Sequence, residues 1–465
     1  MATTALRSTR VVTALGVRPA VVVIDGEHID RVLAHDADVG DVDEPLTDLG
    51  DLVLAPGLVD THVHINEPGR TEWEGFTTAT QAAAAGGVTT LVDMPLNCIP
   101  VTTSAGALHV KLDAAAPQLW VDVGFWGGVV PGNADALAGL VEAGALGAKA
   151  FMVHSGIDEF PNVDEHQLRT AMLCLREAGA PLLAHAELDL GAQVHEPDPR
   201  KYAGYLQSRP AAWEDAAIAL LIRLCRETGC SVHVVHLSSA DSLPQIRAAK
   251  AERLPLTVET CAHYLCLRAE DIADGDTRFK CAPPIRDDDN RERLWSGLRE
   301  GVIDFVVTDH SPCTPALKGE HGDFHAAWGG IASLQLGLAS LWQEAHARGI
   351  PATELFTWCS ARPAAFAGLS TRKGAIAPGL DADLIAWEPD DVRTLAADEL
   401  RFRHRISPYV GRSLRGEVRC TWLRGAIVYD VRGQHGPALR EPPRGRALLH
   451  RDTASPRKSP PENPT

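Results

Sequence analysis

Eight short apolar runs recur along the middle of the chain, separated by stretches long enough for a helix. The runs span residues 57–65, 88–94, 119–125, 147–153, 181–187, 231–237, 255–260 and 303–309. The stretches between them, such as 211–227 and 240–253, are rich in Ala, Leu, Glu and Arg and predict amphipathic helices. Eight strand–helix units over about 250 residues predict an α/β fold with a TIM-like (β/α)8 barrel. An open doubly wound sheet is the alternative, and it is less favoured because no Gly-rich dinucleotide fingerprint follows the first strand.

The two ends of the chain carry a different pattern, in which short strands alternate with turns. This pattern covers residues 11–12, 20–24 and 52–54, and it returns in 382–387, 418–423 and 426–429. We therefore expect residues 1–55 and 370–430 to form one small β-sandwich domain and residues 56–369 to form the barrel. Residues 431–465 contain seven prolines and seven Lys or Arg against three Asp or Glu, which predicts a disordered tail.

Composition and charge exclude several classes of protein. Hydrophobic residues make up 45% of the chain and charged residues 23%, as in ordinary globular proteins. The formal net charge of −17 argues against a nucleic-acid partner, which would need clustered Lys and Arg. No apolar run approaches the roughly 18 residues of a membrane span, so no membrane partner is expected. The ten cysteines form no C-x-x-C motif and predict no disulfide framework, which favours a cytoplasmic protein.

Polar residues end or interrupt five of the eight predicted strands, at the end where such a barrel carries its active site. His62 and His64 lie two residues apart in the first strand, so their side chains point the same way. Lys149 lies in an otherwise apolar run, where an unpaired cation is unfavourable. The residues at the ends of three further strands are His185, His236 and Asp309.

Each of these residues, taken alone, also has a structural explanation. Hydrogen bonds can satisfy paired histidines, Lys149 can extend its ammonium group to solvent, and Asp309 can cap a helix. His233 lies three residues before His236, faces the opposite side of the strand and takes the structural interpretation. Five strands that end in this way at one end of a barrel favour a shared site, and imidazole is a common metal ligand.

The motifs around these residues resemble those of the amidohydrolase superfamily. Residues 56–64 are similar to its opening strand, and the order His-x-His, Lys, His, His, Asp matches its cyclic-amidase branch. That branch includes dihydroorotases, dihydropyrimidinases (hydantoinases) and allantoinases. The chain is most similar to the allantoinases, through HVHINEPGR (62–70), DMPLN (93–97), KAFMVHSGIDEFP (149–161), ETCAHY (259–264), KCAPPIRD (280–287), TDHSPC (308–313), WGGIASLQLG (328–337) and RHRISPYVGR (403–412). The resemblance covers residues 8–430 approximately.

The resemblance implies two divalent metal ions, usually zinc. It assigns His62, His64 and Asp309 to one ion, His185 and His236 to the other, and Lys149, carboxylated by carbon dioxide, to a bridge between the two. A hydroxide that bridges the ions would attack a ring amide, because metal binding depresses the pKa of water from about 16 to about 7. Asp309 would accept the proton of the water and pass it to the leaving nitrogen.

The resemblance also implies hydrolysis of allantoin to allantoate, a step of purine breakdown. Dihydroorotases typically carry Arg, which suits a carboxylate, at the position of Asn66, which suits a neutral polar group. We therefore expect Asn66 and Asn97 to contact allantoin, together with Ala282 and Gly329; the alternative for Asn66 is a turn residue. A dihydropyrimidinase or hydantoinase acting on other rings is a competing interpretation. So is a non-catalytic scaffold of the same fold, although such scaffolds have lost metal ligands.

Two positions depart from the usual motifs of the branch. Ala262 stands where Pro is common, and Ala282 stands where Ser is usual. Neither change is expected to abolish activity. Relatives are commonly tetramers or dimers, so a homo-oligomer is expected by analogy.

Overall fold

A computed structural model describes residues 3–40, 42–432, 438–440 and 442–452, and it contains all eight predicted barrel strands. These are β6 (Leu58–Val63), β7 (Val88–Asp93), β8 (Asp122–Phe125), β10 (Ala148–Phe151), β11 (Leu182–His185), β12 (Val232–Val234), β13 (Leu256–Cys261) and β14 (Phe305–Val307). Seven lie inside the runs that predict them, and β13 extends one residue beyond its run. Most of these strands are shorter than the apolar runs that predict them.

The strands close into a barrel. Neighbouring strands are parallel in the orders β6-β7-β8 and β10-β11-β12-β13-β14, with the short β9 (Gly127–Gly128) beside β10. The backbone N–H of Leu146 donates to Phe125 at 3.0 Å and joins the two groups on one side. On the other side Val63 pairs with His310, and His64 donates to the same residue at 2.8 Å. The predicted barrel is confirmed and the open doubly wound sheet is excluded.

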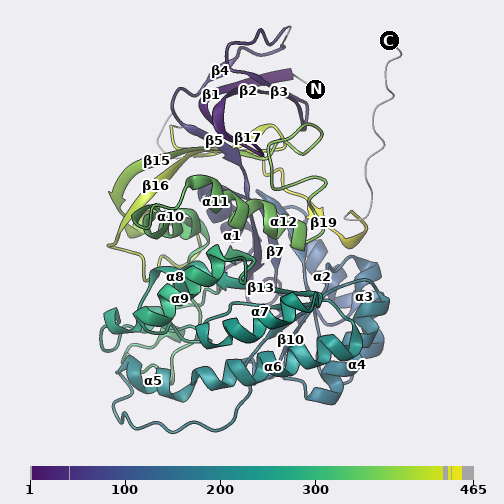
Figure 1. Ribbon diagram of the computed structural model, residues 1–465, viewed down its shortest axis with the longest axis vertical. Coiled ribbons are helices and arrows are strands. Elements are labelled where there is room, and N and C mark those ends of the chain that lie inside the picture. The colour runs from purple at the N-terminus through teal and green to yellow at the C-terminus, as the bar shows by residue number, and fades with distance from the viewer. Residues whose placement is uncertain (1–2, 41, 433–437, 441, 453–465) are drawn as a thin grey trace.

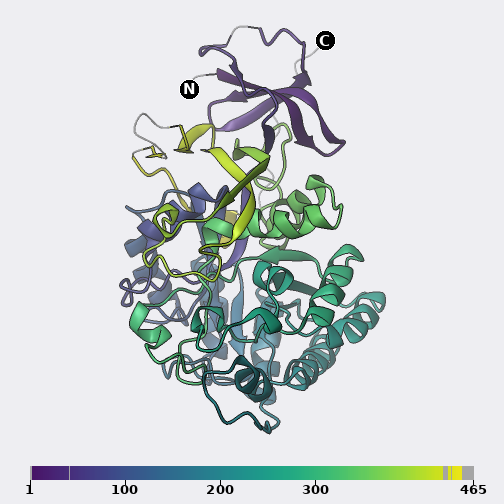
Figure 2. The ribbon, with the colours of Figure 1, turned by 90° about the vertical axis from the view of Figure 1, so that its left-hand side faces the viewer.

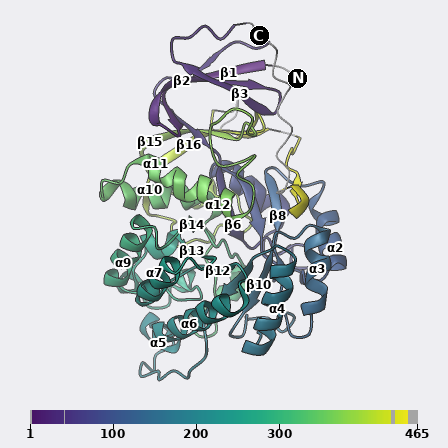
Figure 3. The same cartoon turned by 45° about the vertical axis from the view of Figure 1, so that its right-hand side comes forward.

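Helices lie around the outside of the barrel strands (Figure 3). The longer ones are α1 (Phe76–Ala85), α2 (Ala105–Ala115), α3 (Leu137–Ala143), α4 (Glu165–Glu177), α6 (Ala211–Thr228), α7 (Leu243–Ala251), α9 (Asp288–Arg299) and α10 (Gly337–Ala347). Four short ones are α5 (Tyr202–Ser208), α8 (Ala262–Cys266), α11 (Ala352–Phe356) and α12 (Arg362–Phe366). The two predicted helical stretches correspond to α6 and to α7 with a 3-10 turn before it. Within the described ranges, no helix combines the length and apolar character needed to cross a bilayer.

Both ends of the chain contribute to a second body above the barrel (Figures 1 and 2). Its main strands are β1 (Thr3–Thr13), β2 (Gly16–Asp25), β3 (His28–Ala34), β5 (Val53–Pro56), β15 (Leu384–Thr394), β16 (Ser413–Leu423) and β17 (Ala426–Asp430), with two-residue strands β4 (Thr47–Asp48) and β18 (Ala438–Leu439). Hydrogen bonds join them in the order β18-β17-β16-β15-β5-β1-β2-β3, with β4 beside β1. The predicted second β domain, built from both chain ends, is therefore present.

Part of the segment with the composition of a disordered tail is ordered. β19 (Ala447–Leu448) pairs in parallel with β8, and Leu448 is buried at 1% exposure. Arg446 donates its backbone N–H to Asp122 at 2.8 Å and contacts Glu27. The prediction of disorder is wrong for these residues. The average composition of the segment hides a short apolar run, and this run adds a strand beside the barrel. Residues 453–465 lie outside the described residues.

The junction between the two bodies contains a glycine at which we expect substitution to be destabilising. β5 runs directly into β6 through Gly57, where an added Cβ would overlap with the side chain of Thr89. We expect Gly57→Ala to destabilise the protein by about 1–3 kcal/mol through overpacking. At Gly139 in α3 an added Cβ would meet no atom within 4 Å, so Gly139→Ala should stabilise by about 0.4–1 kcal/mol. Calorimetric melting of both variants checks this, and equal melting temperatures would contradict it.

Candidate metal centre

The first and last barrel strands bring three potential ligands together where the barrel closes. His62 Nε2 lies 3.2 Å from Asp309 Oδ1, and His64 Nε2 lies 3.4 Å from the same oxygen. One ligand atom from each of the three residues falls within 4.8 Å of the others, and all three residues are buried. Two imidazoles and a carboxylate at this spacing form a metal-binding group.

The other three predicted ligands lie beside this group. Lys149 Nζ is 3.2 Å from His62 Nε2, and His185 Nδ1 is 2.9 Å from His236 Nε2. The rings of His62 and His236 have centroids 5.4 Å apart. This contact connects the group formed with Asp309 to the pair formed with His185. The structure therefore brings all six predicted ligand residues to one buried centre.

Two of these residues lie just beyond their strands in an uncommon backbone conformation. β12 ends at Val234 and β14 ends at Val307, two residues before His236 and Asp309 respectively. His236 has φ 42° and Asp309 has φ 44°, in the left-handed region that residues with a Cβ rarely adopt. The apolar runs predict longer strands because they do not reveal these turns. Such backbone costs about 1–3 kcal/mol per residue and is concentrated at functional sites.

Two glutamates orient the imidazoles, and the sequence interpretation assigned no role to either of them. Glu259 on β13 accepts from His62 Nδ1 at 2.5 Å, and Glu187 accepts from His185 Nε2 at 2.6 Å. A carboxylate on one ring nitrogen fixes the tautomer and leaves the other nitrogen for a metal. Glu259 also lies 3.1 Å from the Nε2 of His233, which supports the structural interpretation of that histidine. An acidic residue inside an apolar strand is the signal that could have identified Glu259.

Lys149 differs from two of the other buried lysines. Lys111 lies 2.5 Å from Asp93, and Lys373 lies 2.6 Å from Asp383. Lys149 is 1% exposed, and in the described part of the chain no carboxylate pairs with it. Burial lowers the pKa of Lys149 to about 8, so a larger fraction of its amine is neutral near neutral pH than in an ordinary lysine. A neutral amine is the form that reacts with carbon dioxide.

The electrostatics of the centre fit bound cations. Burial lowers the pKa of His62 and of His236 well below the usual value and raises the pKa of Glu259 well above it. The buried Nδ1 atoms of His64 and His236 have no hydrogen-bond partner among the described residues. Buried imidazoles that are neutral and partly unpartnered, beside carboxyl groups, are the chemistry of a site for divalent metal ions.

A cavity of about 400 Å³ opens onto this centre. Five of the six predicted ligands line it, namely His64, Lys149, His185, His236 and Asp309. Three of the four predicted substrate contacts, Asn97, Ala282 and Gly329, line the same cavity. A small molecule in this cavity would therefore lie against the predicted ligand residues.

Asn66 is the predicted substrate contact that does not line the cavity. It has φ 66°, is 1% exposed, and donates through Nδ2 to the carbonyl of Pro312 at 3.3 Å. This geometry favours the turn interpretation that the sequence left open for it. Contact between Asn66 and the substrate therefore stays a prediction without geometric support.

Comparison with known proteins identifies the family of the chain. A sequence profile described as the amidohydrolase family matches residues 53–428. The chain belongs to the amidohydrolase family. Among its relatives in this family is an allantoinase from Streptomyces avermitilis, 51% identical over 425 residues, which are 91% of this chain and 94% of that protein. An allantoinase from Saccharomyces cerevisiae is 44% identical over 453 residues, with 96% and 95% covered.

Solved structures of the amidohydrolase fold extend the comparison to three dimensions. An L-hydantoinase (dihydropyrimidinase) from Arthrobacter aurescens matches with a TM-score of 0.88 and 27% identity, covering 97% of this chain and 100% of that chain. A dihydropyrimidinase from Brevibacillus agri matches with a TM-score of 0.82 and 27% identity, covering 92% and 95%. The predicted barrel with a small β domain is thus the architecture of this group of enzymes.

The contact between Glu259 and His62 gives a testable prediction. Glu259→Gln replaces the carboxyl group that holds the His62 ring, and we expect metal affinity to fall about 10- to 100-fold. Competition between the protein and a chelator of known affinity measures this. Glu252→Gln is the matched control, because Glu252 is an exposed carboxylate paired with Arg226. Equal affinities in the two variants would contradict an orienting role for Glu259.

Proposed function

We propose that the protein hydrolyses the hydantoin ring of allantoin to allantoate, a step of purine breakdown. The observation that carries the proposal is the convergence of six residues, two imidazole pairs, a lysine and an aspartate, on one buried centre, with five of the six lining one cavity. The substrate is supported by the relatives named allantoinase, which match over nearly the whole chain.

The same residues would hold two divalent metal ions, for which zinc suits the imidazole-rich donor set. His62, His64 and Asp309 would hold one ion, His185 and His236 the other, and carboxylated Lys149 would bridge them. When bound, the ions would supply an activated water and polarise the carbonyl under attack. An anionic carbamate would also resolve the unfavourable burial of Lys149 as a cation.

Asp309 is suited to move the proton in this reaction. Burial raises its pKa, but the hydrogen bond and charge of His64 outweigh burial, and the pKa of Asp309 is lowered. The carboxylate can therefore accept a proton as the oxygen of water bonds to the ring carbonyl carbon. The ring C–N bond then breaks, and Asp309 returns the proton to the leaving nitrogen. Such general acid–base work contributes about 10²–10⁴-fold to the rate.

The cavity offers a neutral acceptor to a ligand with N–H donors. Asn97 lines it, has φ 65°, and its Oδ1 has no partner in the described part of the chain. A ureido N–H of allantoin could donate to this oxygen. The alternative, a dihydropyrimidinase or hydantoinase acting on other rings, draws support from the structural likeness at a TM-score of 0.88. A non-catalytic scaffold is less supported, because all six ligand residues are present.

Substrate assays test the proposal directly. The purified protein, loaded with zinc or another first-row divalent ion, should turn over allantoin faster than hydantoin, dihydrouracil or dihydroorotate. Activity should disappear with a chelator and return when the metal is restored. Turnover of dihydrouracil without turnover of allantoin would replace the proposed substrate, and a protein that binds no metal would favour the scaffold.

Lys149 provides a second test. Lys149→Ala should lose metal and activity, and a short carboxylic acid such as acetate should restore part of both by replacing the carbamate oxygen. Lys250→Ala is the control, because it removes a lysine paired with Asp304 at 2.6 Å, outside the lining of the cavity. It should keep its activity and gain nothing from acetate. Full activity of Lys149→Ala would contradict the bridging role.

Assembly and location belong to the same proposal. We expect a homo-oligomer, a tetramer or a dimer, in the cytoplasm. Light scattering of the purified protein measures the assembly, and fractionation of the cells that produce it measures the location.

A further inference from the structure

Arg209 lies between two helices on the wall of the cavity. The residue before a proline is disfavoured in α conformation, so α5 ends at Ser208 and α6 begins only after Pro210. Arg209 accordingly has φ −134° and ψ 70°, and its side chain lines the cavity together with Tyr205 and Lys280. Two helices therefore fix the position of a guanidinium group beside the site.

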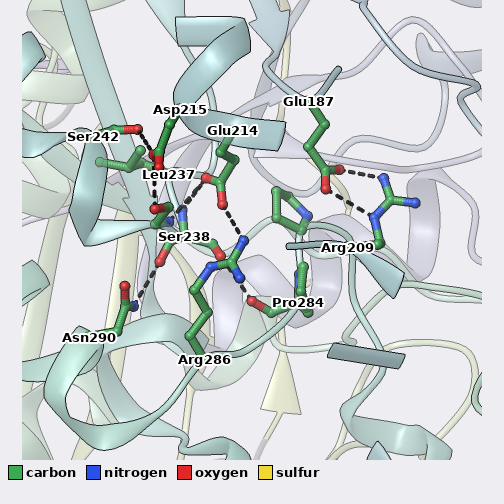
Figure 4. Close-up of polar contacts among 12 residues, drawn as sticks. Glu187, Arg209, Glu214, Asp215, Leu237, Ser238, Ser242, Pro284, Arg286 and Asn290 are labelled. Atoms are coloured by element: carbon green, nitrogen blue, oxygen red, sulfur yellow. Dashed lines mark hydrogen bonds and ion pairs between the residues drawn. The ribbon is translucent and has the colours of Figure 1, made fainter. Parts of the chain in front are cut away.

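One edge of Arg209 is bound to Glu187, as Figure 4 shows. Nε donates to Glu187 Oε1 at 3.0 Å, and Nη2 donates to Glu187 Oε2, so the pair is bidentate. Glu187 is fully buried, and its Oε2 also lies 2.6 Å from His185 Nε2. The carboxylate that orients His185 therefore also sets the direction of the Arg209 guanidinium.

The remaining nitrogen of Arg209, Nη1, has no hydrogen-bond acceptor among the described residues. Two of its neighbours on this wall also act as donors. Lys280 Nζ donates to the carbonyls of His325 and Ala327, and the hydroxyl of Tyr205 donates to a backbone carbonyl at 2.7 Å. A wall with a charged donor that no described residue accepts from fits a ligand that brings an acceptor oxygen.

We propose that Arg209 recognises the ureido arm of the substrate by donating from Nη1 to the carbonyl oxygen of that arm. The inference rests on the proposed function, because allantoin carries a ureido arm that hydantoin lacks. The arm branches from the ring carbon next to the carbonyl that is opened. Arg209 and the metal-binding His185 share Glu187, so one carboxylate holds the group that binds the arm and a ligand beside the reacting carbonyl.

The chain contains a second buried Glu–Arg pair that serves as a matched control (Figure 4). Arg286 Nη2 donates to Glu214 Oε2 at 2.9 Å, and Glu214 accepts a backbone N–H of Ser238 at 2.8 Å. Arg286 does not line the cavity. Arg286→Lys therefore reports the effect of weakening a buried pair without removing a group that faces the substrate.

The test compares Arg209→Lys, Arg286→Lys and the wild-type protein, each loaded with metal. Lysine keeps a cation beside Glu187 but lacks the second edge of the guanidinium. In Arg209→Lys we expect KM for allantoin to rise about 10- to 100-fold, the range for a lost charge-assisted hydrogen bond, with kcat within about threefold. The inhibition constant of hydantoin, which lacks the arm, and the metal content should stay unchanged. Arg286→Lys should leave KM unchanged.

Three results would each overturn the proposal. They are an unchanged KM for allantoin, an equal rise in the inhibition constant of hydantoin, and a loss of metal in which only kcat falls. Failure of the wild-type protein to turn over allantoin would instead overturn the proposed function. A crystal structure of metal-loaded Asp309→Asn with allantoin gives a readout that does not depend on the stability of an Arg209 variant. It should place the ureido oxygen within hydrogen-bond distance of Arg209, and an arm bound elsewhere in the cavity would overturn the proposal.

Discussion

The metal centre depends on one backbone contact, the hydrogen bond of 2.8 Å from His64 to the carbonyl of His310. This contact closes the barrel and brings His62 on β6, and His64 directly after it, against the residue that follows Asp309. Asp60 on β6 reinforces it by accepting the backbone N–H of Thr308, 248 residues away, at 3.2 Å. In an open sheet β6 and β14 would not meet, so His62, His64 and Asp309 would not be brought together.

The second domain stabilises this closure. His310 is fully buried, and its Nε2 lies 3.4 Å from the carboxylate of Glu74. Arg403, in the segment between β15 and β16, donates its backbone N–H to the same carboxylate at 3.1 Å. Ser407 in that segment donates to the carbonyl of Ala332 at 2.7 Å. The late motif of residues 403–412 therefore returns from the β domain to the barrel and fixes the backbone beside the metal ligands.

The sequence predicted the parts of the site that follow from the strand pattern. A barrel collects the ends of its strands, so a histidine, lysine or aspartate at such an end could be assigned before any distance was known. Glu259 was missed because its role depends on a contact with His62, 197 residues away, that no local pattern encodes. Asn66 was assigned a substrate contact because a motif shows residue identity but not the left-handed turn that directs its side chain to Pro312.

The buried charged groups of the centre need opposite charges both on the cavity side and at the centre itself. Burial favours the neutral form of every group there, yet Glu187 is ionised. Burial raises its pKa, but the charge of Arg209 and the hydrogen bond from His185 outweigh burial and lower the pKa to about 2. Arg209 thus compensates a buried carboxylate from the cavity side, and bound cations would compensate the carboxylates of Glu259 and Asp309 from the inside. A centre compensated from both sides would suit the carbamate proposed for Lys149, where an isolated ammonium is unfavourable.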